Sequence, residues 1–126
     1  KERIIKANQL WKPRKLMIEE NNQGLPIIHD LKIIHKLTNI VGFKTTATSK
    51  PEIVNNLINA FSSKKINVPN DDIYKSELET FTMSISPTGK PKFEAAAGFH
   101  DDICMSLAIT WECKNKHKYN GQYNFN

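Results

Sequence analysis

Two adjacent aspartates, Asp101 and Asp102, stand at the start of a strongly apolar stretch that runs to Trp111. At about 100° per residue, the apolar side chains of residues 103–111 gather on one broad face, which predicts a mostly buried helix. On the same projection, Asp101 lies near the apolar face and Asp102 points away from it. A carboxylate aimed at a core costs several kcal/mol if it stays charged and unpaired, so Asp101 needs a partner.

Two kinds of partner would satisfy this requirement. Acids are favoured in the first turn of a helix, where they accept hydrogen bonds from free backbone N–H groups and complement the helix dipole. A divalent cation would also compensate an inward carboxylate. The aspartate pair by itself favours capping, because that is the common role of acids at a helix start. Only a second acidic position that converges on the pair would favour the cation.

Glu19 provides such a position. Residues 16–19 are a short apolar run closed by the polar residues 21–24, which predicts a buried strand that ends in a turn. The apolar stripe in residues 27–37 predicts a helix, and residues 40–43 predict a second buried strand. A strand, a helix and a strand of this length form a βαβ unit, so Glu19 would stand at the carboxyl end of its strand, where α/β folds place ligands. The alternative is a solvated surface role, which is common for glutamates at strand ends.

The remaining residues predict further helices and strands. Ser49-Lys-Pro-Glu52 fits a capping box at the start of a helix. Residues 82–85 and 92–95 read as the two strands of a hairpin. The tail, residues 114–126, has no apolar period and is expected to fray. Helices are also expected over residues 1–10 and 69–81, with an edge strand at 66–68.

Length and composition place the chain among single-domain globular proteins. It has 126 residues and no apolar run near the roughly 18 residues that a membrane span needs. No signal-peptide pattern occurs, so an intracellular location is expected. The 18 Lys and Arg residues exceed the 13 Asp and Glu residues, which suits a polyanionic partner. Cys104 and Cys113 lie too far apart along one predicted helix to form a disulfide, and no Cys/His cluster has zinc spacing.

Four segments carry a family resemblance, in this order and spacing: Ile18-Glu-Glu-Asn-Asn-Gln-Gly24, Thr48-Ser-Lys50, Glu77-Leu78 and Gly98-Phe-His-Asp-Asp-Ile-Cys-Met-Ser-Leu-Ala108. Together they resemble the C-terminal nuclease domain of the large terminase subunit of tailed bacteriophages, most closely its T4-like branch. The His-Asp-Asp followed by Ser-Leu-Ala is the most specific part. The resemblance covers roughly residues 1–113 and leaves residues 114–126 as a polar, flexible tail.

The resemblance implies an α/β, RNase H-like fold with a mixed sheet flanked by helices, which RuvC-type resolvases share. It implies an endonuclease that uses Mg²⁺ or Mn²⁺, with two ions, to cut concatemeric viral DNA during genome packaging in the host cytoplasm. The implied partners are double-stranded DNA, the rest of the large terminase, the portal and the small terminase. No membrane partner is implied.

Residue by residue, Glu19 matches the second catalytic acid of the family, and the Asp101-Asp102 pair matches the third. Families differ over which member of the pair ligates metal, and the helical projection favours Asp101, with Asp102 in a second contact or in capping. His100 and Lys50 lie where they could approach phosphate, although a turn histidine and a solvated lysine are commoner roles. Phosphate contacts are also expected from other basic residues, which include Arg14 and Lys15.

The chain departs from the family pattern at one acid. The first catalytic aspartate belongs on an early strand, whereas Glu2, the acid that precedes Glu19, lies in a predicted helix. The Walker A motif of the packaging ATPase is absent as well. The chain is therefore expected to be part of a longer terminase, to lack the first strands of the fold, and to need other chain segments for activity. The alternatives are a non-catalytic DNA-binding or assembly module of the packaging motor and a RuvC-like junction resolvase.

Overall fold

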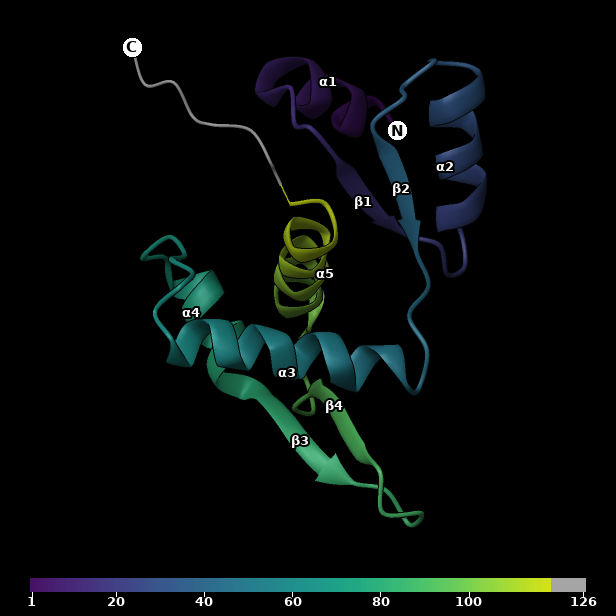
Figure 1. Ribbon diagram of the computed structural model, residues 1–126. Coiled ribbons are helices and arrows are strands. Elements are labelled where there is room, and N and C mark those ends of the chain that lie inside the picture. Colours follow the sequence, from purple (N-terminus) through teal and green to yellow (C-terminus); the bar gives the residue numbers. More distant parts are fainter. Residues whose placement is uncertain (119–126) are drawn as a thin grey trace.

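Within residues 1–118, which the computed structural model describes, the chain forms five helices and four short strands (Figure 1). In chain order they are α1 (Glu2–Trp11), β1 (Leu16–Glu19), α2 (Gly24–Ile33), β2 (Ile40–Phe43), α3 (Ser49–Ser62), α4 (Asp72–Thr80), β3 (Phe81–Ile85), β4 (Pro91–Ala95) and α5 (Asp102–Lys116). The chain is α/β, as its sequence predicts. No helix in this part of the chain has the length and apolar content that a membrane span requires.

The N-terminal half contains the predicted βαβ unit. Strands β1 and β2 pair in parallel, from Leu16 opposite Ile40 to Glu19 opposite Phe43. Helix α2 packs against both strands. The buried residues of this core are Ile28, Leu31 and Ile40. The parallel pairing confirms that Glu19 stands at the carboxyl end of its strand.

The turn after β1 is held by two residues of the Glu19-x-Asn21-x-x-Gly24 pattern. The Asn21 side-chain amide donates a hydrogen bond to the Thr45 carbonyl oxygen at 2.8 Å, which ties this turn to the chain beyond β2. At Gly24 a Cβ atom would lie 1.7 Å from the Glu19 carbonyl oxygen, so a side chain cannot be accommodated there. The first turn of α2 thus lies directly against the end of β1, and both residues fix the position of Glu19.

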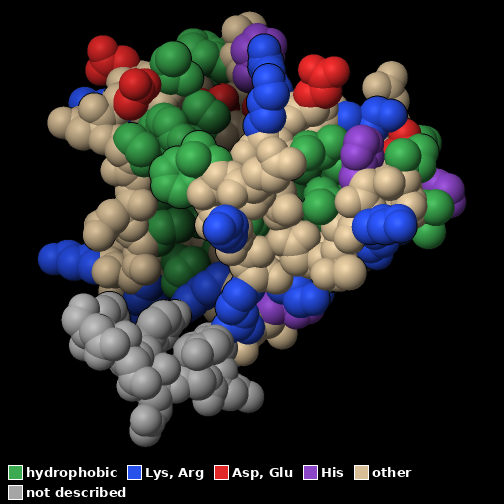
Figure 2. Space-filling model, turned by 90° about the horizontal axis from the view of Figure 1, so that it is seen from above, with side chains coloured by type: hydrophobic (Ala, Val, Ile, Leu, Met, Phe, Trp, Pro, Cys, Tyr) green, Lys and Arg blue, Asp and Glu red, His purple; other side chains and the backbone are tan. Residues whose placement is uncertain are grey.

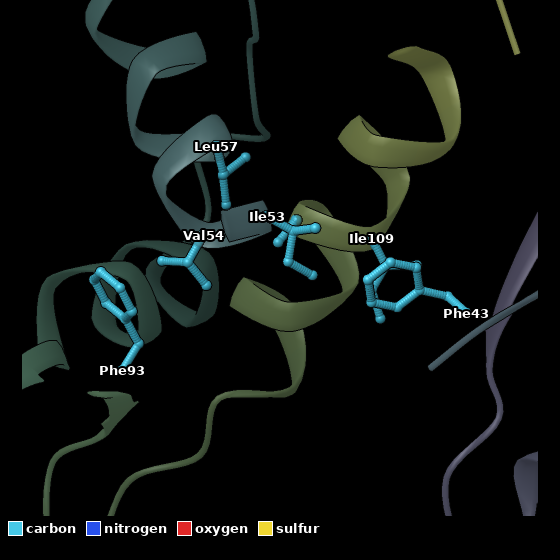
Figure 3. Close-up of a cluster of buried hydrophobic side chains, with 7 residues drawn as sticks. Phe43, Ile53, Val54, Leu57, Phe93 and Ile109 are labelled. Carbon is cyan, nitrogen blue, oxygen red and sulfur yellow. The ribbon is translucent and has the colours of Figure 1, made fainter. Parts of the chain in front are cut away.

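In the C-terminal half, α5 packs against α3, α4 and β1, and α3 also contacts β4. Strands β3 and β4 form an antiparallel hairpin, as predicted, with Phe81 opposite Ala95 and Ile85 opposite Pro91. The buried cluster in Figure 3 draws on four elements and comprises Phe43, Ile53, Val54, Leu57, Phe93, Ala108 and Ile109. Because Phe43 of β2 belongs to this cluster, the packing holds α5 beside the parallel strands.

Helix α3 has a different cap from the predicted one. The sequence predicts a capping box between Ser49 and Glu52, but the reciprocal bonds run between Thr46 and Ser49. The Thr46 hydroxyl accepts from the Ser49 backbone N–H, and the Ser49 hydroxyl accepts from the Thr46 backbone N–H, each at 2.9 Å. The observed capping box thus begins three residues before the predicted one. The cause is that the chain already turns at Thr46, whose carbonyl oxygen accepts a hydrogen bond from the N–H of Lys50.

Three other boundaries differ from the predictions. Residues 66–68 form no strand. Helix α2 ends at Ile33 instead of continuing to Leu37, because Lys36 adopts a left-handed conformation with φ of 53° and the Leu37 N–H bonds back to Leu31. Helix α5 continues through Lys116 and takes in the first part of the predicted tail. Of the remaining tail, residues 119–126 lie outside the described residues.

Candidate functional site

The three predicted acids meet at one cavity of about 350 Å³. Glu19 reaches it from the end of β1, and Asp101 and Asp102 reach it from the start of α5. Besides these acids, the cavity is lined by three apolar residues and four polar ones, namely Met17, Met105 and Ile109, and Thr45, Lys50, Ser106 and Thr110. The structure therefore brings together acids that lie some eighty residues apart in the sequence.

Asp101 occupies the N-cap position of α5, but its side chain does not cap the helix. Only its backbone carbonyl serves the helix, by accepting from the N–H of Met105 at 2.9 Å. Its carboxylate Oδ2 instead lies 3.1 Å from the Nζ of Lys50. Asp101 is 32% exposed and Asp102 belongs to the exposed class, which agrees with the inward and outward directions given by the helical projection. The Asp101 carboxylate is thus directed to the cavity.

Glu77 of α4 performs the capping role that the sequence suggests for the aspartates. Its Oε1 accepts a hydrogen bond from the backbone N–H of Cys104, in the first turn of α5, at 2.9 Å. This N–H is buried, since Cys104 is only 2% exposed. No local pattern connects an acid in one helix with an N–H 27 residues later, so sequence analysis missed this role. The consequence is that the first turn of α5 is stabilised without either aspartate side chain.

Glu19 is half-buried, and among residues 1–118 its carboxylate has no hydrogen-bond or ion-pair partner. Its neighbour Glu20 does not line the cavity and lies against Gly42, where an added Cβ would be 2.0 Å from Glu20 Oε1. The opposite directions of the two glutamates follow from the alternation of side chains along a strand. The cavity therefore contains a carboxylate whose oxygen atoms are available to a ligand.

The chemistry of these acids fits a hard divalent cation, but their number is small. Such cations prefer carboxylate oxygens supplemented by water or phosphate oxygens. In the part of the chain that the structure describes, no three Asp, Glu, His or Cys side chains are close enough to form a metal-binding group. Glu19, Asp101 and Asp102 share the cavity without forming a closed cluster. In this structure the positive charge beside the Asp101 carboxylate comes from the Lys50 ammonium.

Of the predicted phosphate-contacting residues, the structure brings only Lys50 to the acidic cavity. His100 is exposed and does not line it. Arg14 and Lys15 line a different cavity, of about 520 Å³, at the C-terminal end of α5. There the Arg14 guanidinium donates to the carbonyl oxygen of His117 at 3.1 Å. Figure 2 shows that Lys and Arg side chains are spread over the face seen from above, with fewer acids among them.

Neither a protein-family model nor the sequence of a curated protein matches this chain significantly. Solved structures do match. The large terminase nuclease from thermophilic phage G20c superimposes with a TM-score of 0.74, 19% identity, and coverage of 88% of this chain and 59% of that chain. Its structure with bound magnesium gives a TM-score of 0.62, 28% identity, and coverage of 71% and 47%. The large terminase nuclease domain of Thermus phage P74-26 gives a TM-score of 0.57 and 24% identity, with coverage of 75% of this chain and 49% of that chain.

These similarities show that the described part of the chain has an α/β, RNase H-like fold. More specifically, the chain has the fold of the nuclease domain of phage large terminase subunits, as the sequence resemblance implies. The chain spans about half the length of the structures that it matches. Its assignment to the T4-like branch stays a prediction.

Proposed function

We propose that this chain carries part of the divalent-metal site of a phage DNA-packaging nuclease, with Glu19, Asp101 and Asp102 as its ligands. The observation that carries the proposal is the convergence of these acids from the carboxyl end of β1 and the first turn of α5 on one cavity. Carboxyl ends of parallel strands are the usual place for ligands in α/β folds. The magnesium bound in a structural neighbour that is 28% identical supports the same conclusion.

The surroundings of the acids support a role in metal binding. The first turn of α5 is capped by Glu77, so neither aspartate side chain is needed to cap the helix. Glu19 is fixed by a turn that Gly24 allows to approach the strand end closely. Met17 and Ile109 contribute apolar side chains to the cavity lining, and electrostatic interactions are stronger beside apolar groups, where the local dielectric is lower. Pre-organised carboxylates in such a place are suited to a small, highly charged cation.

When bound, divalent ions would supply an activated water and neutralise charge on a phosphodiester. Glu19 and Asp101 would hold the ions, and Asp102, which is exposed, would be a further ligand. The substrate is double-stranded DNA, and basic residues such as Lys90 and Lys92 contact phosphates without reading the base sequence. The biological setting is the cutting of concatemeric viral DNA in the host cytoplasm, together with the rest of the large terminase, the portal and the small terminase.

We further propose that another carboxylate, from terminase residues outside this chain, completes the site. This proposal is supported by the small number of acids at the cavity and by the partial coverage of the structural neighbours. Full cleavage activity is then expected only from a longer terminase polypeptide. In that polypeptide Asp101→Asn should abolish plasmid cleavage with Mn²⁺, and equal cleavage by the variant and the wild type would exclude Asp101 from the site.

Metal binding can be tested on this chain directly. Mn²⁺ affinity, measured by electron paramagnetic resonance of the free ion, should fall by about ten-fold or more in Glu19→Gln and in Asp101→Asn. Glu79→Gln is the matched control, because Glu79 is an exposed acid of α4 that does not line the cavity. Equal affinities in all three variants would show that Mn²⁺ binds elsewhere.

DNA-binding measurements separate the alternative functions. A non-catalytic DNA-binding or assembly module would bind duplex DNA in a salt-sensitive manner that is indifferent to divalent metal and to Glu19→Gln. A RuvC-like junction resolvase would prefer a four-way junction over linear duplex. The proposed packaging nuclease should bind linear duplex at least as well as the junction.

A further inference from the structure

We propose that Lys50 is a tethered counter-ion that competes with the divalent metal for Asp101 and, once displaced, directs its ammonium into the adjoining cavity to bind a phosphate group. This inference rests on the proposed function, since it assumes that Asp101 ligates metal. It assigns Lys50 a regulatory role in metal loading, beyond a simple contact with DNA.

The ion pair itself is the first observation. Lys50 lies in the first turn of α3, and its Nζ is 3.1 Å from Asp101 Oδ2. Among the described residues, this ammonium is the sole side-chain partner of the Asp101 carboxylate. A divalent ion that bound the same oxygen would lie close to the ammonium and would repel it. The ion pair with Lys50 and the coordination of a metal ion therefore compete for the Asp101 carboxylate.

The position of Lys50 between two cavities is the second observation. Besides the acidic cavity, Lys50 lines a cavity of about 620 Å³ that lies between the chain after β2 and the β3–β4 hairpin. The polar residues around this second cavity are Thr45, Thr46, Ser86, Thr88, Lys90, Lys92 and Glu94. Glu94 is already paired with Lys92 at 3.1 Å. Lys50 can thus leave Asp101 by rotation of its own side chain, while α3 stays in place.

The donors of the second cavity suit a phosphate group. Hydroxyl and ammonium groups are the donors that bind phosphate oxygens. Thr45 lines both cavities, and its buried Oγ1 has no hydrogen-bond partner within residues 1–118. A buried hydroxyl without a partner is costly unless a bound group satisfies it. A phosphate oxygen that accepts from Thr45 and Lys50 together would do so.

The ion pair is weak enough to be displaced. Both side chains are partly exposed, at 27% for Lys50 and 32% for Asp101. A pair of this kind changes an equilibrium constant by only about two- to five-fold. Metal and phosphate are then linked reciprocally: a metal ion frees Lys50 for phosphate, and a phosphate that holds Lys50 frees Asp101 for metal. The site would load metal more readily when a phosphodiester is present.

Mn²⁺ affinity tests the competition. Lys50→Met keeps the aliphatic side chain and removes the ammonium, so the variant should bind Mn²⁺ about two- to five-fold more tightly than the wild type. Lys44→Met is the matched control for the general loss of one positive charge, because Lys44 is exposed and lines neither cavity. Lys50→Gln should behave as Lys50→Met does, and the urea unfolding of each variant shows whether it is folded.

Two further measurements follow the displaced ammonium. In nuclear magnetic resonance of lysine ¹³Cε groups, the Lys50 signal should move on addition of Mg²⁺ and should not move in Asp101→Asn. In Mg²⁺, Lys50→Met should bind a short DNA duplex more weakly than Lys44→Met does.

The outcomes distinguish the two proposals. If Mn²⁺ binding is unaffected by Glu19→Gln and Asp101→Asn, the proposed function fails, and the role of Lys50 fails with it. If Mn²⁺ binding depends on Asp101 but Lys50→Met binds it equally or more weakly, the metal site stands and the competition is overturned. If the affinity rises but duplex binding in Mg²⁺ matches that of Lys44→Met, the phosphate-binding step is overturned.

Discussion

Removal of the Glu77 carboxylate should loosen the start of α5, although Glu77 belongs to another helix. Glu77→Ala would leave the N–H of Cys104 without an acceptor at a position that is only 2% exposed. The loss of a helix cap and of a charged hydrogen-bond acceptor lowers the free energy of unfolding by about 1–3 kcal/mol. With a urea dependence of about 1–3 kcal/mol per M, the unfolding midpoint should fall by about 1 M. Glu77→Gln keeps an acceptor oxygen and should recover most of this loss.

Urea unfolding followed by circular dichroism measures these changes. The matched control is Glu79→Ala, an exposed position in the same helix, which should change the free energy of unfolding by less than about 0.5 kcal/mol. Asp101→Ala is the decisive comparison, because its side chain makes no cap hydrogen bond. If Asp101→Ala destabilises the chain more than Glu77→Ala does, Asp101 is the cap and the reasoning about Glu77 is refuted.

Three other expectations concern packing and the cysteines. Burial raises the pKa of the Cys104 thiol to about 11 and also raises the pKa of the Cys113 thiol. Because the thiolate is the reactive form, neither cysteine should react with a thiol reagent at pH 8 until urea unfolds the chain. Rapid reaction of the folded protein would contradict this expectation. Gly24→Ala should destabilise the chain by about 3 kcal/mol, because the added Cβ atom would lie 1.7 Å from the Glu19 carbonyl oxygen. A thermal melt unchanged from that of the wild type would disprove this contact. Leu31→Ala should cost about 2–5 kcal/mol in urea unfolding, whereas Ile33→Ala, at a side chain that is 64% exposed, should cost much less; similar losses would contradict the assigned core.

Much of the fold follows from local patterns. The strands at Leu16–Glu19 and Ile40–Phe43 were predictable because each is a short apolar run closed by polar or turn-forming residues. Their parallel pairing follows from the helix between them. The inward direction of Asp101 follows from the helical projection of α5. These features depend on residues that are close in the sequence, so the sequence alone could predict them.

The details of the site depend on contacts between residues that are distant in the sequence. The cap on Cys104 comes from Glu77, and the counter-ion of Asp101 is Lys50, 51 residues away. No periodicity or capping rule links such positions. The extension of α5 has the same origin, since Arg14 donates to the carbonyl oxygen of His117 at the end of that helix. Tertiary contacts, and not helix propensity alone, determine these features.

The location of a bound Mn²⁺ ion tests the central claim most directly. Mn²⁺ broadens the nuclear magnetic resonance signals of nearby amides, so sub-stoichiometric Mn²⁺ should broaden the signals of Thr45 and Ser106, which line the acidic cavity. The signals of Lys15 and Lys114, at the opposite end of α5, should stay sharp. The broadening should disappear in Asp101→Asn. Broadening centred on Lys15 and Lys114, or broadening at the acidic cavity that survives Asp101→Asn, would contradict the metal site proposed for this chain.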